Sequence, residues 1–179
     1  MGLLPETLER LVSQLNKLPG IGTRSAERIA LYLLHCNSND VKQLAELMLA
    51  ARERVRHCSI CGALTETDPC LICSDDRRDS SIICVVEKPT DIINIEKTGV
   101  FKGKYHVLGG KISPLNGIEP EDLRIVELEK RINPENIKEV ILALGADVEG
   151  DATSFYIAKR LARYAVKISR IAHGIPAGG

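Results

Sequence analysis

The spacing of hydrophobic side chains changes once along the chain, close to residue 80. Before that point apolar residues recur every three or four positions, which predicts helices over residues 3–18, 23–35 and 41–56. After it, short apolar runs predict strands at residues 81–86, 104–108, 139–144 and 167–172. Helical spacing between those runs predicts helices at residues 89–98, 121–131 and 151–165. Strands that alternate with helices predict a parallel sheet with right-handed crossovers, so the expected class is α/β with a helical N-terminal region.

Two of these elements carry further expectations. The run at residues 81–86 (SIICVV) is apolar at nearly every position, as in a strand that is buried on both faces. Asp40 precedes the third predicted helix, and we expect its side chain to cap that helix.

Four of the six cysteines form two Cys-x-x-Cys pairs, Cys58 with Cys61 and Cys70 with Cys73, separated by eight residues. This spacing is typical of a tetrahedral zinc site in which four thiolates leave no open position for chemistry. The alternatives are two disulfides or simply buried thiols. Disulfides need an oxidising compartment, and the N-terminal residues do not resemble a signal peptide, so we expect a cytoplasmic protein. We predict one structural zinc ion per chain, whose binding and the folding of this small module are one event.

Composition limits the remaining possibilities. Acidic and basic residues balance at 24 each, so any site for an anion must be local rather than a property of the whole surface. Aromatic residues make up 3% of the chain, with no tryptophan, which weighs against base-stacking platforms. The apolar runs are too short to cross a bilayer, so no membrane is expected. The other two cysteines, Cys36 and Cys84, lie in apolar runs and are expected to be core thiols.

Residues 19–22 (PGIG) must separate the first two predicted helices, and an ordinary helical hairpin would account for them. However, Gly20 and Gly22 would let the backbone approach a ligand, and the free N–H groups that begin the next helix suit a phosphate. Arg24 and Arg28 share a face there, with Lys17 before the turn. Cations at a helix N-terminus oppose its dipole, and an external anion would explain them. Residues 18–22 (LPGIG) resemble a helix-hairpin-helix motif, which implies contacts with duplex phosphates that do not depend on base sequence.

Acidic residues follow two of the predicted strands, at the edge of a parallel sheet where ligands usually bind. Glu87 follows the first strand, and Asp147, Glu149 and Asp151 follow the third at the start of the next helix. Carboxylates that converge from two strand ends could hold Mg²⁺. Equally, Glu149 and Asp151 could cap the helix, and the sequence leaves both alternatives open.

This acidic pattern resembles the Toprim domain, the Mg²⁺ fold of topoisomerases and primases. The family has a Glu after the first strand and an Asp-x-Asp after the third, often followed by Glu-Gly-Glu. Here Asp147 matches the second Asp and residues 149–151 match the Glu-Gly-Glu, whereas Gly145 replaces the first Asp. One carboxylate is therefore missing, which counts against two-metal phosphoryl chemistry.

A nucleotide site is not supported. Residues 109–112 (GGKI) resemble a P-loop only loosely, because Tyr105 and Ile112 stand where that motif needs glycine and serine or threonine.

A helix-hairpin-helix, a four-cysteine module and a degenerate Toprim domain, in this order, resemble the bacterial RecR family over essentially the whole chain. The resemblance is carried by residues 18–22, the four cysteines, and residues 86–87, 148–153 and 172–179. It implies a DNA-binding region at 1–56, a four-cysteine zinc finger at 57–76, a Toprim domain at 80–173, and at 174–179 the start of a C-terminal segment that is shortened here.

The resemblance also implies a function. RecR-like proteins are mediators of recombinational repair that act on gapped DNA and single-strand/double-strand junctions, and help RecA replace single-strand-binding protein. They work with RecO, and in some cases RecF, and assemble as dimers and ring-shaped tetramers. They are not known as enzymes, and the acidic group would then serve a basic partner such as RecO. The alternatives are a Mg²⁺-dependent Toprim phosphotransferase or nuclease, and a zinc-stabilised scaffold that contacts only protein.

The last 25 residues carry basic side chains and no acidic one. These are Lys159, Arg160, Arg163, Lys167, Arg170 and His173. Such a strip would suit DNA that lines a ring, or a solvated surface whose charges are balanced by acids elsewhere in the chain.

Overall fold

The computed structural model describes residues 4–132 and 136–172 and divides the chain into two compact units, Met1–Arg54 and Val55–Gly179. Each unit is described by itself below. The predicted C-terminal segment at 174–179, and the last residue of the predicted Toprim domain, lie outside the described residues.

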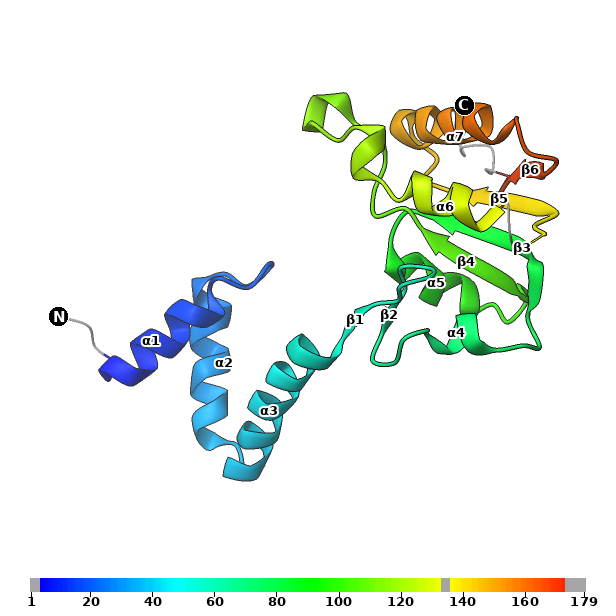
Figure 1. Cartoon of the computed structure of the whole chain (residues 1–179). Helices are drawn as coiled ribbons and strands as arrows, with labels where there is room; N and C mark the ends of the chain where they lie inside the picture. Colours follow the sequence, from blue (N-terminus) through cyan, green and yellow to red (C-terminus); the bar gives the residue numbers. More distant parts are fainter. Residues whose placement is uncertain (1–3, 133–135, 173–179) are drawn as a thin grey trace. The chain divides into compact units, whose positions relative to one another are not determined.

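The first unit consists of three helices, α1 (Glu6–Leu15), α2 (Thr23–His35) and α3 (Ser38–Arg54), which can be followed in Figure 1. Helices α1 and α2 contact each other, and their buried residues are Leu8, Ala26 and Ala30. Helix α2 has the predicted bounds. Helix α1 ends before residue 18, because residues 16–18 close a tighter turn whose N–H groups donate to carbonyls near the helix end.

Helix α3 differs from the prediction at both ends. It begins at Ser38, so Asp40 lies inside its first turn and the predicted cap is wrong. The side chain of Asn37 caps the helix instead, because its Oδ1 accepts a hydrogen bond of 2.9 Å from the N–H of Asn39. The helix ends at Arg54 rather than at residue 56, where a short strand begins. Cys36, expected in a core, is only half-buried between α2 and α3.

The second unit is built on a four-stranded parallel sheet, which confirms the predicted α/β class. Its strands are β3 (Asp79–Val86), β4 (Gly103–Val107), β5 (Glu139–Ala143) and β6 (Lys167–Arg170). Their order across the sheet is β4-β3-β5-β6, with every pair parallel. The predicted strands therefore exist with ends that shift by one or two residues.

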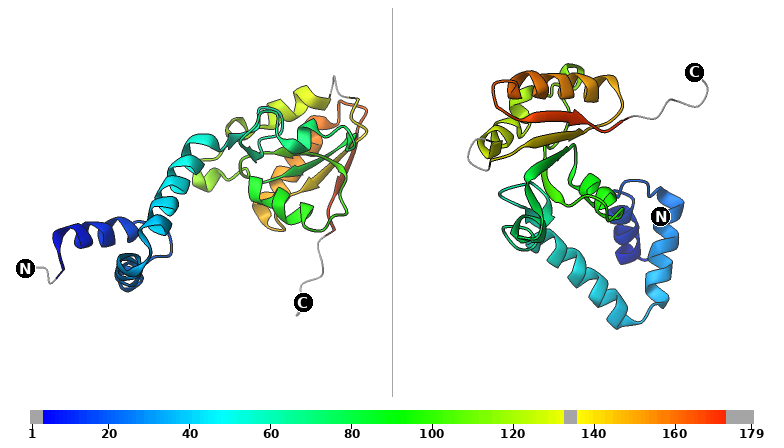
Figure 2. Two further views of the ribbon diagram at one scale, coloured as in Figure 1. Left: turned by 90° about the horizontal axis from the view of Figure 1, so that it is seen from below. Right: turned by 90° about the vertical axis from the view of Figure 1, so that its right-hand side faces the viewer.

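Strand β3 is buried on both faces because alternate side chains enter two different cores. Ile83 and Val85 pack with residues of β5, α6 (Ile125–Ile132) and α7 (Val148–Leu161). Cys84 and Val86 belong to a second cluster with Ile92 of α5 (Pro89–Glu96). Burial raises the pKa of the Cys84 thiol to about 12, in keeping with a core residue. Figure 2 shows the sheet and these helices from two further directions.

Two helices of this unit begin at other residues than predicted. The helix expected from 121 starts at Ile125, because Pro120–Asp122 forms a separate 3₁₀ turn and Leu123 is extended. The helix expected from 151 starts at Val148, because the Asp147 side chain accepts a hydrogen bond from the N–H of Gly150 and caps it. Over the described ranges, 4–132 and 136–172, no helix is long and apolar enough to span a membrane.

Before the sheet, residues 55–75 form a small module. Strands β1 (Arg56–His57) and β2 (Leu64–Thr65) pair as an antiparallel hairpin, and a single turn of helix, α4 (Leu71–Ser74), follows. Cys58 and Cys61 lie on the loop of the hairpin. Cys70 is the N-cap residue of α4, and Cys73 lies within this helix.

Candidate metal centre and nucleic-acid interface

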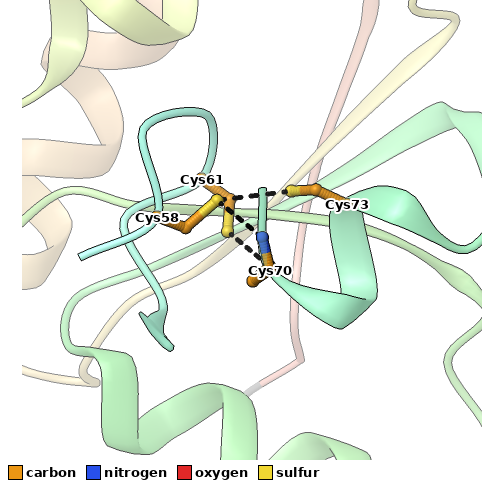
Figure 3. A group of neighbouring side chains, drawn as sticks. All are labelled: Cys58, Cys61, Cys70 and Cys73. Atoms are coloured by element: carbon orange, nitrogen blue, oxygen red, sulfur yellow. Dashed lines mark hydrogen bonds between the residues drawn. The ribbon is translucent and has the colours of Figure 1, made fainter. Parts of the chain in front are cut away.

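The four predicted cysteine ligands converge on one point of the module (Figure 3). Their sulfur atoms all lie within 4.8 Å of one another. The Sγ atoms of Cys58 and Cys73 are 4.0 Å apart, and those of Cys61 and Cys70 are 3.5 Å apart. Zinc–sulfur bonds of about 2.3 Å imply tetrahedron edges of about 3.8 Å, so the cluster has the dimensions of a zinc tetrathiolate.

The surroundings of the sulfurs also suit thiolates. The backbone N–H of Ala63 points at the sulfur of Cys61 at 3.5 Å, and the N–H of Cys70 points at the sulfur of Cys58 at 3.4 Å. A hydrogen bond from the Cys73 thiol lowers the pKa of Cys61 to about 5, whereas burial raises the pKa of Cys70 to about 11. Without a cation, burial therefore disfavours the thiolate of Cys70, and a zinc ion would supply the positive charge that lets this thiol ionise.

The module shares its core with the sheet. Cys58, Cys61 and Cys70 are buried in the same cluster as Tyr105 and Val107 of β4. The N–H of Val107 donates a hydrogen bond of 2.7 Å to the carbonyl of Cys61. The zinc ion that the donor set fits thus holds together a hairpin and a helical turn that rest against the parallel sheet.

Lys104 of β4 fixes the far end of the module. Its Nζ donates to the carbonyl oxygens of Ile72, Cys73 and Asp75 at 3.0, 3.0 and 2.9 Å. The residue is only 8% exposed, so three carbonyl dipoles take the place of water around this ammonium. The sequence offered no sign of this role beyond a lysine inside a short predicted strand.

In the first unit, residues 16–22 form the predicted turn between α1 and α2. Gly20 has φ of +79°, a left-handed conformation that favours glycine, and the N–H of Ile21 donates to the carbonyl of Leu18. Gly22 occupies the N-cap of α2 in an extended conformation, and in the part of the chain that the structure describes no side chain caps this helix. The N–H groups of its first turn therefore face outward as donors.

The basic residues predicted at this turn are at the surface. Arg24 and Arg28 are exposed one helical turn apart at the start of α2, and neither forms an ion pair within the described residues. Lys17 is exposed as well, and its Nζ donates to the side chain of Gln14 at 3.2 Å. The turn thus brings outward N–H donors together with two exposed guanidinium groups.

The predicted acidic residues divide into two sets. Glu87, Asp147 and Glu149 gather at the carboxyl ends of β3 and β5, around the ammonium of Lys111. Asp151 instead forms an ion pair with Arg170 of β6. Of the alternatives open from sequence, the helix cap is Asp147 rather than Glu149 or Asp151. Among the described residues, the four cysteines are the only group of three or more potential ligands close enough to hold a metal.

Lys111 is the member of this edge that sequence reasoning missed. It follows β4, which lies next to β3, so its side chain reaches the same edge of the sheet as the acids. The hydrogen bond to Asp147 raises the pKa of Lys111, and the same contact lowers the pKa of Asp147.

Comparison with known proteins assigns these three sites to three family models. Residues 8–52 match the helix-hairpin-helix of RecR, residues 55–75 match the four-cysteine zinc-finger domain of RecR, and residues 81–172 match the Toprim domain. Fold and sites together define a zinc-containing recombination protein with a DNA-binding hairpin.

Full-length relatives show which recombination protein family this is. The recombination protein RecR of Desulfatibacillum aliphaticivorans is 50% identical over 179 residues, which is 100% of this chain and 90% of that protein. The RecR of Moorella thermoacetica is 50% identical over 175 residues, covering 98% of this chain and 88% of the relative. That of Acidothermus cellulolyticus is 48% identical over 172 residues, with coverage of 96% and 86%. The chain belongs to the RecR family.

Proposed function

We propose that the chain is a mediator of recombinational DNA repair that binds gapped and junction DNA as a clamp. In this proposal it acts with RecO, and with RecF, to help RecA replace single-strand-binding protein. It assembles through dimers into a ring-shaped tetramer, works in the cytoplasm and catalyses no reaction itself. Its parts are a DNA-binding region at 1–56, a zinc finger at 57–76 and a Toprim domain at 80–173.

The single observation that carries DNA binding is the turn at the start of α2. Gly22 leaves the first N–H groups of the helix without a side-chain cap among the described residues, and Arg24 and Arg28 stand exposed beside them. Such a helix start attracts an anion, and backbone donors recognise a phosphate without reading bases. Lys17, Gly20, Gly22, Arg24 and Arg28 are the proposed DNA-contacting residues.

The acidic edge supports a mediator better than an enzyme. Gly145 supplies no carboxylate where Toprim enzymes carry one, and Lys111 already neutralises part of the remaining charge. The side chains of Asp147 and Glu149 are 53% and 41% exposed, so their outer faces remain available to a basic partner such as RecO.

The test combines binding with loading. Fluorescence anisotropy would measure the affinity for duplex, gapped and single-stranded DNA of two unrelated sequences, and light scattering would give the mass of the free and DNA-bound protein. We expect similar affinity for both sequences and an oligomer on DNA. When RecO is added, RecA should assemble faster on gapped DNA that is coated with single-strand-binding protein. Binding to RecO without any binding to DNA at low salt would instead identify a protein-only scaffold.

A further inference from the structure

The ammonium of Lys111 lies among three carboxylates that come from two different strand ends. Its Nζ is 2.5 Å from Asp147 Oδ2, 3.7 Å from Glu87 Oε2 and 3.9 Å from Glu149 Oε2. The Lys111 side chain is only 15% exposed, so the ammonium has exchanged most of its water for carboxylate oxygens.

The backbone holds Lys111 in this place. The N–H of Ile112 donates a hydrogen bond of 2.9 Å to the hydroxyl of Thr153 on α7, which fixes the loop after β4 against the start of that helix. On the other side, the hydroxyl of Ser113 donates to the carboxylate of Glu149. The cation and its ligands are therefore attached to the same short stretch of structure, and the pairing is not a loose contact between two flexible surface chains.

Gly145 marks a fourth position around the same ammonium. A Cβ atom added there would lie 3.2 Å from Asp147 Oδ2 and 3.5 Å from Lys111 Nζ. A short acidic side chain on that Cβ would start within contact distance of both groups. Gly145, where the Toprim acid is missing, and Lys111 are thus close together in space, although they are far apart in the sequence.

We propose that Lys111 supplies the positive charge that a divalent cation would otherwise supply to Glu87, Asp147 and Glu149. The site is in this sense a closed cation site, and Mg²⁺ can enter only when the ammonium leaves. Bonds from Mg²⁺ to oxygen are about 2.1 Å long, so an ion bound to Asp147 could not share that carboxylate's inner side with an ammonium 2.5 Å away. This inference concerns the acidic edge alone and does not depend on the proposed DNA and partner functions.

The decisive variant is Lys111→Met, which keeps an unbranched side chain of similar length and removes its charge. Zinc-loaded protein would be titrated with MgCl₂ and with MnCl₂ by calorimetry at constant ionic strength. Removing a unit charge within about 4 Å of three carboxylates should tighten divalent binding by about tenfold or more relative to wild type. Lys111→Arg retains a cation and should behave as wild type.

Lys88 provides a matched control. Its Nζ is 3.6 Å from Glu87 Oε1, but the Lys88 side chain is 64% exposed, against 15% for Lys111. Lys88→Met changes the net charge by the same amount and should leave divalent affinity within about twofold of wild type, because solvent screens an exposed charge. Equal gains in the two variants would show a general charge effect and would overturn the proposal.

A second variant tests the fourth position. Adding Gly145→Asp to Lys111→Met should tighten divalent binding further, whereas no gain over the single variant would contradict the placement of Gly145 in the site. Wild-type protein that binds Mg²⁺ as tightly as Lys111→Met would also overturn the proposal.

A separate measurement covers the case in which Lys111→Met does not fold. If loss of the internal cation unfolds the protein, millimolar MgCl₂ should restore the native circular dichroism, and failure to restore it would count against the proposal. On wild-type protein, acetylation followed by mass spectrometry should modify Lys111 much more slowly than Lys88. Equal reaction rates would show that Lys111 is not held inside the carboxylate cluster.

Discussion

The Nζ atom of Lys104, on strand β4, donates a hydrogen bond of 3.0 Å to the carbonyl oxygen of Cys73, one of the four predicted zinc ligands. Two further carbonyls, of Ile72 and Asp75, accept from the same nitrogen. A single side chain of the sheet thus closes the end of the helical turn that carries the last two cysteines. The hydrogen bonds of Lys104 thus connect the zinc module to the sheet.

We predict that Lys104→Met loosens the zinc module. The change leaves three partly buried carbonyls without their donor and should lower the free energy of unfolding by about 2 kcal/mol. The melting temperature should fall by about 5 °C, and a chromogenic chelator should remove zinc faster than from wild type. Lys102→Met is the matched control, since Lys102 is exposed in the residues just before β4. Equal zinc release from both variants would show that Lys104 does not hold the module.

A second prediction concerns the metal itself. Elemental analysis of natively purified protein should give about one zinc per chain, because four cysteines fill a single tetrahedral site. Replacing Cys58 and Cys61 by Ser should reduce zinc to near zero and cost solubility, since the cluster buried with Tyr105 and Val107 is then disrupted. Cys36→Ser, outside the cluster, should leave the zinc content unchanged. Wild-type protein without zinc would contradict this prediction.

A third prediction concerns the hairpin. Replacing Arg24 and Arg28 together by Ala should weaken binding to every DNA sequence alike and reduce the slope of log affinity against log salt by about two units. The control replaces Arg52 and Arg54, which are exposed at the end of α3 and give the same change in net charge. If the two double variants lose affinity equally, the effect is one of net charge and the hairpin has no special role.

A fourth prediction follows from a buried histidine. Burial lowers the pKa of His106 to about 3, and its Nε2 lies 2.7 Å from the carbonyl of Arg124, with Arg131 near the other ring nitrogen. The unfolded chain binds a proton here near pH 6.5 and the native protein does not, so protonation favours unfolding. This residue's contribution is therefore fully present above about pH 6.5 and is lost progressively as the pH falls toward 3.

The measurement is urea unfolding between pH 5 and 7.5. His106→Gln keeps a donor for the Arg124 carbonyl but cannot titrate. Wild type should lose up to about 1.4 kcal/mol of unfolding free energy more than the variant for each pH unit below 6.5. Parallel curves for the two proteins would mean that His106 does not contribute to acid sensitivity.

The sequence was most informative where spacing alone determines geometry. Two Cys-x-x-Cys pairs define a zinc site before any coordinate is known, because each pair turns back on itself over a fixed short distance. The continuous apolar run at residues 81–86 likewise predicted the two-sided burial of β3, with Ile83 on one face and Cys84 on the other.

The contributions of Lys104 and Lys111 could not be predicted in this way. Lys111 reaches the acidic residues only because β3 lies between β4 and β5 in the sheet. Local sequence patterns do not contain this strand order. Lys104 reaches carbonyls about 30 residues away in the chain. Both roles depend on tertiary neighbours, and a single lysine carries no periodic signal.

The sequence also could not show which acidic residues lie beside the basic strip near the C-terminus. Its paired charges are answered by acids from other elements: Arg160 and Arg163 pair with Glu129, Lys167 with Glu139, and Arg170 with Asp151. His173, the last member of the strip, lies outside the described residues. Of the two interpretations open from sequence, a surface balanced by acids fits these contacts better than a lining for DNA.

The shared core of the zinc module and the sheet bears on how the chain folds during synthesis. A ribosome releases Cys58, Cys61 and Cys70 well before Tyr105 and Val107, the residues of β4 that are buried in the same cluster. The nascent chain therefore presents a thiol cluster that can already capture zinc while its protective cover does not yet exist. During that interval the thiols are open to oxidants and competing metals, and completion of β4 ends the exposure.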